Sequence, residues 1–228
     1  MADGTSEKYV GEFIASDRDR FVLATKYTLN TRRGDPNAGG NHRKNMIQSL
    51  EASLKGLSTH YIDLSWVHAW DPLTPIEEMM RTLDDVIRVG KVLYIGISDA
   101  PAWIALQANT LANLKGRIEF TGLQIEYSLV ERTPERELLP MADALDIGVT
   151  AWSPLGGGVL TGKYNKGYED RLREQQLPQQ KQNIPPSSTT MDTTEKETNN
   201  NSNRLDIQNG LENRFLNDRN ILIVFLYM

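Results

Sequence analysis

Cysteine is missing from all 228 residues, so the chain can form neither disulfides nor thiolate metal sites, and no site residue below is assigned to a metal. This composition is typical of a reducing compartment. Long hydrophobic runs are missing too. The longest uncharged apolar stretch, ILIVFLYM at 221–228, is far shorter than the roughly 20 residues that a membrane-spanning helix needs. No signal-peptide pattern follows Met1, because the polar stretch ADGTSEK comes next. We therefore expect a cytoplasmic protein without a membrane partner.

Long basic runs are also absent, and the formal net charge is -5. Nucleic acids and anionic membrane surfaces attract proteins through clustered Lys and Arg. We therefore expect no nucleic-acid partner, and the charge balance itself predicts little beyond solubility.

Up to about residue 165, short apolar runs rich in β-branched residues alternate with stretches whose apolar residues recur at helical spacing. This alternation, at about 30 residues per unit, predicts an α/β fold built from βαβ units with a parallel sheet. The predicted strands are FVLAT at 21–25, YIDLSWVH at 61–68, VLYIGIS at 92–98, FTGLQIEYSL at 120–129 and GVTAWSPL at 148–155.

A helix is predicted before the first of these strands, with Ser6 as its N-cap and Glu7 in its first turn. Its apolar face should consist of Tyr9, Val10, Phe13 and Ile14. Asp63 lies inside the second predicted strand. A buried carboxylate is costly without a partner, so we expect one for it.

Each predicted strand ends in polar or reactive side chains. These are Lys26, then His68, then Ser98 and Asp99, then Gln124 with Glu126 and Tyr127, then Ser153. In β/α barrels and open α/β sheets alike, the functional site lies at the carboxyl ends of the strands. The repeated placement therefore predicts one site at this end of the sheet.

Lys26 and His68 each allow a second interpretation. Lys26 could be a rim lysine that protects a strand end, and His68 a satisfied polar group. On neighbouring strands, however, the two can approach one polar atom, where the lysine supplies positive charge and the histidine a switchable donor. Trp70 and Trp152 can line a pocket or simply pack.

The glycine cluster LGGGVLTGK, at 155–163, matches neither the dinucleotide fingerprint GxGxxG nor the Walker phosphate loop. Its backbone N–H groups could approach a phosphate with help from Lys163, or the segment could be a tight turn. From about residue 172 the chain is rich in Gln, Asn, Ser and Thr, which predicts disorder. The apolar end of 205–228 is either a docking element or an aggregation hazard.

Six segments together carry a resemblance to a known family. They are GTSEKYVGEF, FVLATK, SLKGLSTHYIDLSWVHAWD, GKVLYIGISD, GLQIEYSL and GVTAWSPLGGGVLTGKY, in that order. Over about residues 3–165 the chain resembles the aldo-keto reductase superfamily, in the branch of NADP-dependent oxidoreductases that is also similar to potassium-channel β subunits. The resemblance implies a (β/α)8 TIM barrel and hydride transfer between NADP and a small carbonyl substrate.

The resemblance also implies roles for individual residues. Lys26 and His68 match the catalytic lysine and histidine of the family, where the lysine lowers the pKa of a tyrosine proton donor and the histidine orients the carbonyl. Ser98, Asp99 and Gln124 match the residues that hold the nicotinamide carboxamide, and Trp152 the ring that stacks on the nicotinamide. The segment that wraps the diphosphate corresponds to Ser153, Pro154, Leu155, Gly157 and Lys163.

The sequence departs from the family pattern at both ends. Met1 stands where the family has its tyrosine, the family aspartate is absent, and the pattern fails after about residue 171. Alternation along a strand turns Tyr27 away from the face that Lys26 uses, so it should not replace that tyrosine. We therefore expect an incomplete barrel of about five βα units, strands 3 to 7 of the family barrel, in residues 1–171, and a divergent tail in 172–228.

The expected function is NADP-dependent reduction of aldehydes and ketones to alcohols, impaired by the missing tyrosine and aspartate. The alternatives are a non-catalytic module that binds a nucleotide or a partner, and a truncated product without a function. An incomplete barrel leaves strand edges open, which predicts self-association.

Overall fold

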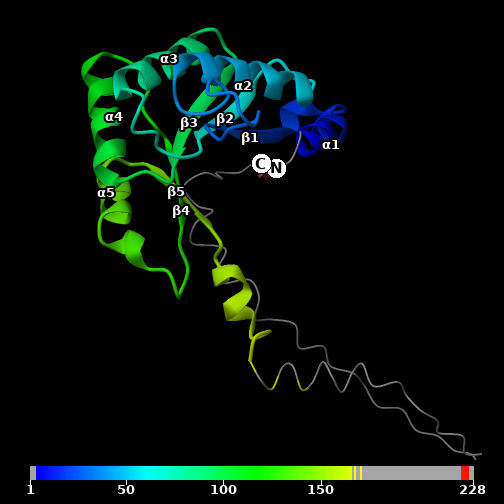
Figure 1. The fold of residues 1–228 in the computed structure, drawn as a ribbon, viewed down its shortest axis with the longest axis vertical. Helices are drawn as coiled ribbons and strands as arrows, with labels where there is room; N and C mark the ends of the chain where they lie inside the picture. The colour runs from blue at the N-terminus through cyan, green and yellow to red at the C-terminus, as the bar shows by residue number, and fades with distance from the viewer. Residues whose placement is uncertain (1–3, 166, 168–169, 171–221, 226–228) are drawn as a thin grey trace, which may run out of the picture. The chain divides into compact units, whose positions relative to one another are not determined.

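The computed structural model describes residues 4–165, 167, 170 and 222–225. The described residues fall into two compact units. The first contains 4–154 and 222–225, and the second contains 155–165, 167 and 170. Both are drawn in Figure 1, and each is described by itself below.

Six parallel strands form one sheet in the described part of the first unit, in the order β5-β4-β3-β2-β1-β6. Their bounds are Phe21–Tyr27 for β1, Ile62–Val67 for β2, Val92–Ser98 for β3, Gly122–Glu126 for β4, Gly148–Trp152 for β5 and Leu222–Phe225 for β6. The strands β1 to β5 are the five predicted from the sequence, and they follow one another across the sheet. With the helices between them, they form an incomplete α/β barrel of the TIM type, as predicted.

The strand β6 was not predicted as part of the sheet. It pairs with the first half of β1 in parallel register, from Phe21 opposite Leu222 to Ala24 opposite Phe225. One of the two strand edges that we expected to be open is therefore partly paired. The predicted disorder of 172–228 otherwise lies outside the described residues, and self-association through the edges remains a prediction.

Helices alternate with the strands β1 to β5 and lie along their outer side (Figure 1). They are α1 at Thr5–Ile14, α2 at Arg43–Gly56, α3 at Ile76–Arg88, α4 at Ala102–Leu114 and α5 at Leu138–Ala144. Short 3-10 turns lie at Arg18–Arg20 (η1), Thr133–Glu135 (η2) and Gly156–Thr161 (η3). No helix in the described ranges is both long enough and apolar enough to span a bilayer.

The predicted apolar face of α1 was right for Val10 and Ile14, which pack in or against the core, and wrong for Tyr9 and Phe13. Gly4 rather than Ser6 is the N-cap, and Tyr9 and Phe13 are 69% and 64% exposed. Besides Ile14, the helix turns Glu7 and Gly11 inward. A Cβ on Gly11 would come within 2.7 Å of the Leu57 carbonyl oxygen, so the glycine allows a backbone approach that decides which face is buried.

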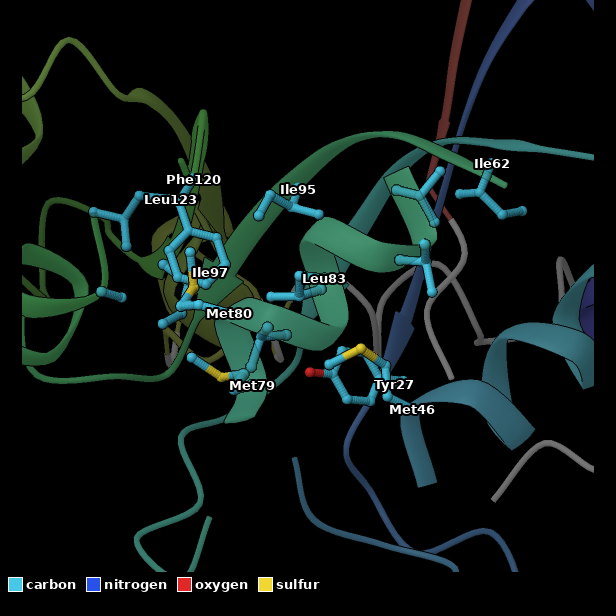
Figure 2. Close-up of a cluster of buried hydrophobic side chains, with 14 of the residues drawn as sticks. Tyr27, Met46, Ile62, Met79, Met80, Leu83, Ile95, Ile97, Phe120 and Leu123 are labelled. Carbon is cyan, nitrogen blue, oxygen red and sulfur yellow. The ribbon is translucent and has the colours of Figure 1, made fainter. Parts of the chain in front are cut away.

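The hydrophobic core lies between the sheet and the helices (Figure 2). Alternate strand residues point into it, among them Leu23, Ile95 and Ile97, and they meet Met80 and Leu83 of α3. Burial of each such side chain contributes about 1.5–3 kcal/mol to stability. Because every second residue of a strand points the other way, the same strands present a second set of side chains on the opposite face.

Asp63 has the partner that we expected. Its carboxylate lies 2.6 Å from Nη2 of Arg18 and also accepts a hydrogen bond of 2.9 Å from the Leu23 backbone N–H. The Arg18 guanidinium stacks on the Tyr61 ring at 4.1 Å and donates to the carbonyl oxygens of Phe21 and Tyr61. This network ties η1 to β1 and β2.

Candidate functional site

One predicted site residue at the carboxyl end of each of β1, β2, β3 and β4 lies on the same face of the sheet. Lys26 lies beside Trp66, Trp66 beside Gly96, and Gly96 beside Gly122. Lateral neighbours in a parallel sheet point to the same side. His68, Ser98 and Gln124 each follow Trp66, Gly96 and Gly122 by two residues, so their side chains point to the same face. Ser98 lies directly opposite Gln124. We call Lys26, His68, Ser98 and Gln124 the polar row.

Lys26 and His68 interact electrostatically. Lys26 is only 6% exposed, and burial lowers the pKa of its amine, while the negative charge of Asp99 opposes that shift. The pKa of the half-buried His68 is also lowered, first by burial and then by the Lys26 charge, again against Asp99. At neutral pH the imidazole is therefore uncharged and can donate one hydrogen bond while it accepts another.

Unmet hydrogen-bonding capacity is concentrated on the face of the sheet that carries the polar row. Gln124 is fully buried, yet neither its amide oxygen nor its amide nitrogen has a partner. Nδ1 of His68 and the indole nitrogen of Trp66 are also buried and unpartnered. These four atoms are most of the six such atoms in the described part of the chain. Because buried polar groups are nearly always satisfied in folded proteins, their clustering points to a ligand.

The chemistry of the row fits the carboxamide of a nicotinamide. A carboxamide carries both a donor and an acceptor, as the Gln124 amide does, so the two groups can satisfy each other. The Ser98 hydroxyl, buried and directly across from Gln124, adds a group that can donate and accept.

Asp99 and Ser153 adopt left-handed backbone conformations directly beyond β3 and β5, with φ of 41° and 54°. Such strained positions are common at functional loops. A cavity of about 430 Å³ opens beside Asp99, between α4, η2 and α5, and is also lined by Glu126, Arg136 and Glu137. Of the predicted strand-end residues, Asp99 and Glu126 line this cavity, and the members of the polar row do not.

The sequence left the roles of Trp70 and Trp152 open, and the structure gives the two side chains different surroundings. Trp70 packs against the core and edge-on against Trp103, with ring centroids 5.7 Å apart, so its role is packing. Trp152 is half-buried and lies beside Glu126, on the same face as Gln124. It is therefore on the side of the sheet that the proposed stacking role requires.

Tyr27 lies on the opposite face, as alternation predicted, and its ring packs in the core beside Met46 (Figure 2). Burial, and then the charge of Asp71, raise the pKa of its hydroxyl well above the usual value. A phenol that holds its proton so strongly and faces away from Lys26 is unsuited to replace the family tyrosine.

Leu155, Gly157 and Lys163 belong to the second unit, whereas Ser153 and Pro154 belong to the first. Within the second unit, Gly157 and Gly158 have left-handed φ of 62° and 95° inside η3. A Cβ on Gly158 would lie 2.6 Å from the Lys163 ammonium, so the glycine gives that side chain room to fold back along the loop. The segment is thus a glycine-dependent tight turn, and its role at a diphosphate remains a prediction.

Trp66 is the residue of this face that sequence analysis missed. Its role could have been found by placing the three predicted strands side by side, because this alignment puts one large ring next to two glycines. Within the described ranges, no cluster of three or more His, Asp or Glu side chains could hold a metal ion.

Comparison with known proteins gives the family. The aldo/keto reductase family matches residues 2–211, so the chain belongs to this family. It is 43% identical over 162 residues to norsolorinic acid reductase of Aspergillus flavus, covering 68% of this chain and 42% of the relative. It is 42% identical over 163 residues to an aryl-alcohol dehydrogenase of Pestalotiopsis microspora, covering 69% and 42%.

A norsolorinic acid reductase of Emericella nidulans is 44% identical over 160 residues, covering 67% of this chain and 41% of the relative. The chain thus spans about two fifths of the length of these curated relatives. The likeness to potassium-channel β subunits remains a prediction.

Proposed function

We propose that the protein is an NADP-dependent oxidoreductase of the cytoplasm that reduces aldehydes and ketones to alcohols. The observation that carries the proposal is the polar row, in which the Lys26 charge contributes to the lowered pKa of His68 and both polar atoms of the buried Gln124 amide lack a partner. The names of the relatives, norsolorinic acid reductase and aryl-alcohol dehydrogenase, suggest aromatic carbonyl compounds as the substrate class.

In the proposed reaction, Ser98, Asp99 and Gln124 hold the coenzyme carboxamide, and Trp152 stacks on the nicotinamide ring. The residues that the family resemblance assigns to the diphosphate, Ser153, Pro154, Leu155, Gly157 and Lys163, keep that role in the proposal. When bound, the reduced coenzyme supplies the hydride that the carbonyl carbon takes up.

His68 and Lys26 act on the carbonyl oxygen, which gains negative charge as the hydride arrives. The neutral imidazole of His68 donates a hydrogen bond to this oxygen and thereby orients the carbonyl. The buried positive charge of Lys26 favours the developing negative charge in a site of low dielectric constant. The oxygen must also gain a proton, and the family takes it from the tyrosine in whose place this sequence has Met1. For the 228-residue chain itself, we propose that it binds the coenzyme through the polar row.

Two measurements test this proposal. Fluorescence titration should detect binding of NADPH by the 228-residue chain with a Kd in the micromolar range, about 8 kcal/mol of binding free energy. A chain extended upstream by a segment with the family Asp and Tyr should oxidise NADPH in the presence of benzaldehyde. In that extended chain Lys26→Met should reduce kcat by about a hundredfold or more.

Lys91→Met is the matched control, since Lys91 forms a surface ion pair with Glu51 far from the polar row in the sheet. It should leave kcat unchanged. No NADPH binding by either chain, or full activity of the Lys26 variant, would refute the proposal.

A second candidate is a non-catalytic module that keeps nucleotide or partner binding, and the unpartnered Gln124 amide fits binding without turnover equally well. It predicts NADPH binding by both chains without aldehyde-dependent oxidation in either. Turnover by the extended chain would exclude it.

A further inference from the structure

Trp66 occupies the centre of the face that carries the polar row. It belongs to β2, lies between Lys26 of β1 and Gly96 of β3, and is only 1% exposed. Its indole N–H is buried without a partner. A tryptophan normally satisfies this donor when it is buried, so the position calls for an explanation.

Two glycines make room for the indole ring. A Cβ on Gly96 would overlap with Cζ3 and Cε3 of the ring, and a Cβ on Gly122 would lie 2.8 Å from Cη2. The six-membered ring of Trp66 therefore lies across β3 and β4, over the positions where their side chains would otherwise stand. Because two neighbouring strands lack a Cβ at the same level, the ring can lie against both backbones.

Three members of the polar row form the next layer of the same face, while Lys26 lies at the level of Trp66. His68, Ser98 and Gln124 each follow the level of Trp66, Gly96 and Gly122 by two residues, which is about 7 Å along a strand. In parallel β/α sheets the side chains of such levels stack on one another. The Trp66 ring is thus the surface beneath the unpartnered groups of His68 and Gln124.

We propose that Trp66 is a positioning residue for the nicotinamide end of the coenzyme. Its ring is the floor of the site and sets the depth at which a carboxamide meets Ser98 and Gln124. A floor of this kind excludes water and stops the long Gln124 side chain from tilting into the space below. This inference rests on the proposed function, because it concerns the same site.

The test compares Trp66→Leu and Trp66→Phe with Trp103→Phe in the 228-residue chain, by titration with NADPH. Trp66→Leu removes the floor over Gly122 and should raise the Kd about tenfold or more, since small misplacements at such sites are costly. Trp66→Phe keeps an aromatic ring over Gly96 and should recover most of the loss. Trp103 is 55% exposed on α4, so its replacement is the matched control and should leave the Kd unchanged.

Two further readouts separate positioning from a structural role. Urea unfolding reports the stability of each variant, and a merely structural tryptophan would lower the unfolding midpoint without changing the Kd of the folded chain. Energy transfer from indole to bound NADPH should fall in Trp66→Phe and stay as in wild type in Trp103→Phe. If Trp66→Leu does not fold, the energy transfer measured in Trp66→Phe decides between a positioning role and a structural role.

The outcomes distinguish the positioning role of Trp66 from the proposed function. Wild-type Kd and wild-type energy transfer in the folded Trp66 variants would overturn the role of Trp66 and leave the proposed function standing. Failure of the wild-type chain to bind NADPH or NADH would overturn both.

Discussion

Replacement of Gln124 by methionine tests whether the site is built for a ligand at the expense of stability. The Gln124 side chain is fully buried in β4, and both of its polar atoms lack a partner. Methionine has nearly the same length and volume, so the exchange removes the two unmet groups without leaving a cavity. We expect the variant to be more stable than the wild type and to bind the coenzyme poorly.

The magnitude follows from the cost of burying an unsatisfied polar group. Each such group costs about 1–3 kcal/mol, and removal of both should raise the free energy of unfolding by about 2 kcal/mol. For a chain of this size that gain corresponds to a rise in Tm of roughly 4–8 °C. The loss of the amide contacts should weaken NADPH binding about tenfold or more.

Asn109 offers a matched control, because it is also buried but fully satisfied. Its amide nitrogen donates to the Phe120 carbonyl at 3.1 Å, and its amide oxygen accepts from the Phe120 N–H at 2.8 Å. Asn109→Leu should therefore lower the free energy of unfolding by about 2–3 kcal/mol. Urea unfolding without coenzyme measures both variants, since the midpoint shifts with stability when the slope is unchanged.

The result that would refute this reasoning is a Gln124→Met variant that unfolds at lower urea than the wild type. It would mean that the Gln124 amide is hydrogen-bonded in the coenzyme-free protein. Unchanged NADPH binding by a stabilised variant would instead separate Gln124 from the proposed site.

Four further predictions concern single side chains. Lys26→Met removes one of the two influences that lower the His68 pKa, so the imidazole should titrate at higher pH in NMR spectra; an unchanged pKa would contradict their proximity. In the wild type, acidification below about 6.5 should weaken the fold through His68, because the unfolded chain takes up that proton first. Tyr27→Phe removes a buried unpartnered hydroxyl and should add about 1 kcal/mol of stability with normal NADPH binding, whereas lost turnover in the extended chain would make Tyr27 a proton donor. Asp63→Asn breaks the largely buried pair with Arg18 and should cost about 3 kcal/mol in urea unfolding; a loss below about 1 kcal/mol would count against the network.

The order of strands and helices could be predicted because parallel strands covered on both faces appear as short continuous apolar runs. The runs FVLAT and VLYIGIS correspond to Phe21–Tyr27 and Val92–Ser98 in the structure. The orientation of α1 could not be predicted in this way. Tyr9 and Phe13 have the right spacing for a buried face, but a backbone contact at Gly11 turned them outward.

The site could be predicted in part for a related reason. Side chains that follow consecutive parallel strands meet at one edge of the sheet, so Lys26, His68, Ser98 and Gln124 were identifiable without coordinates. Trp66 was not, because its importance depends on which residues of β3 and β4 lie beside it. Trp70 looked equivalent to Trp152 in sequence, yet it packs edge-on against Trp103.

The amino-acid sequence alone determined the family, the alternation of strands and helices, and the polar residues that end each strand. These features are local, since they depend on spacing along the chain and on the apolar or polar character of single residues. The tertiary structure decided the lateral register, the pairing of β6 with β1, and the placement of the Trp66 ring over Gly96 and Gly122. Such features arise from contacts between residues far apart in the chain, and only packing in three dimensions determines them.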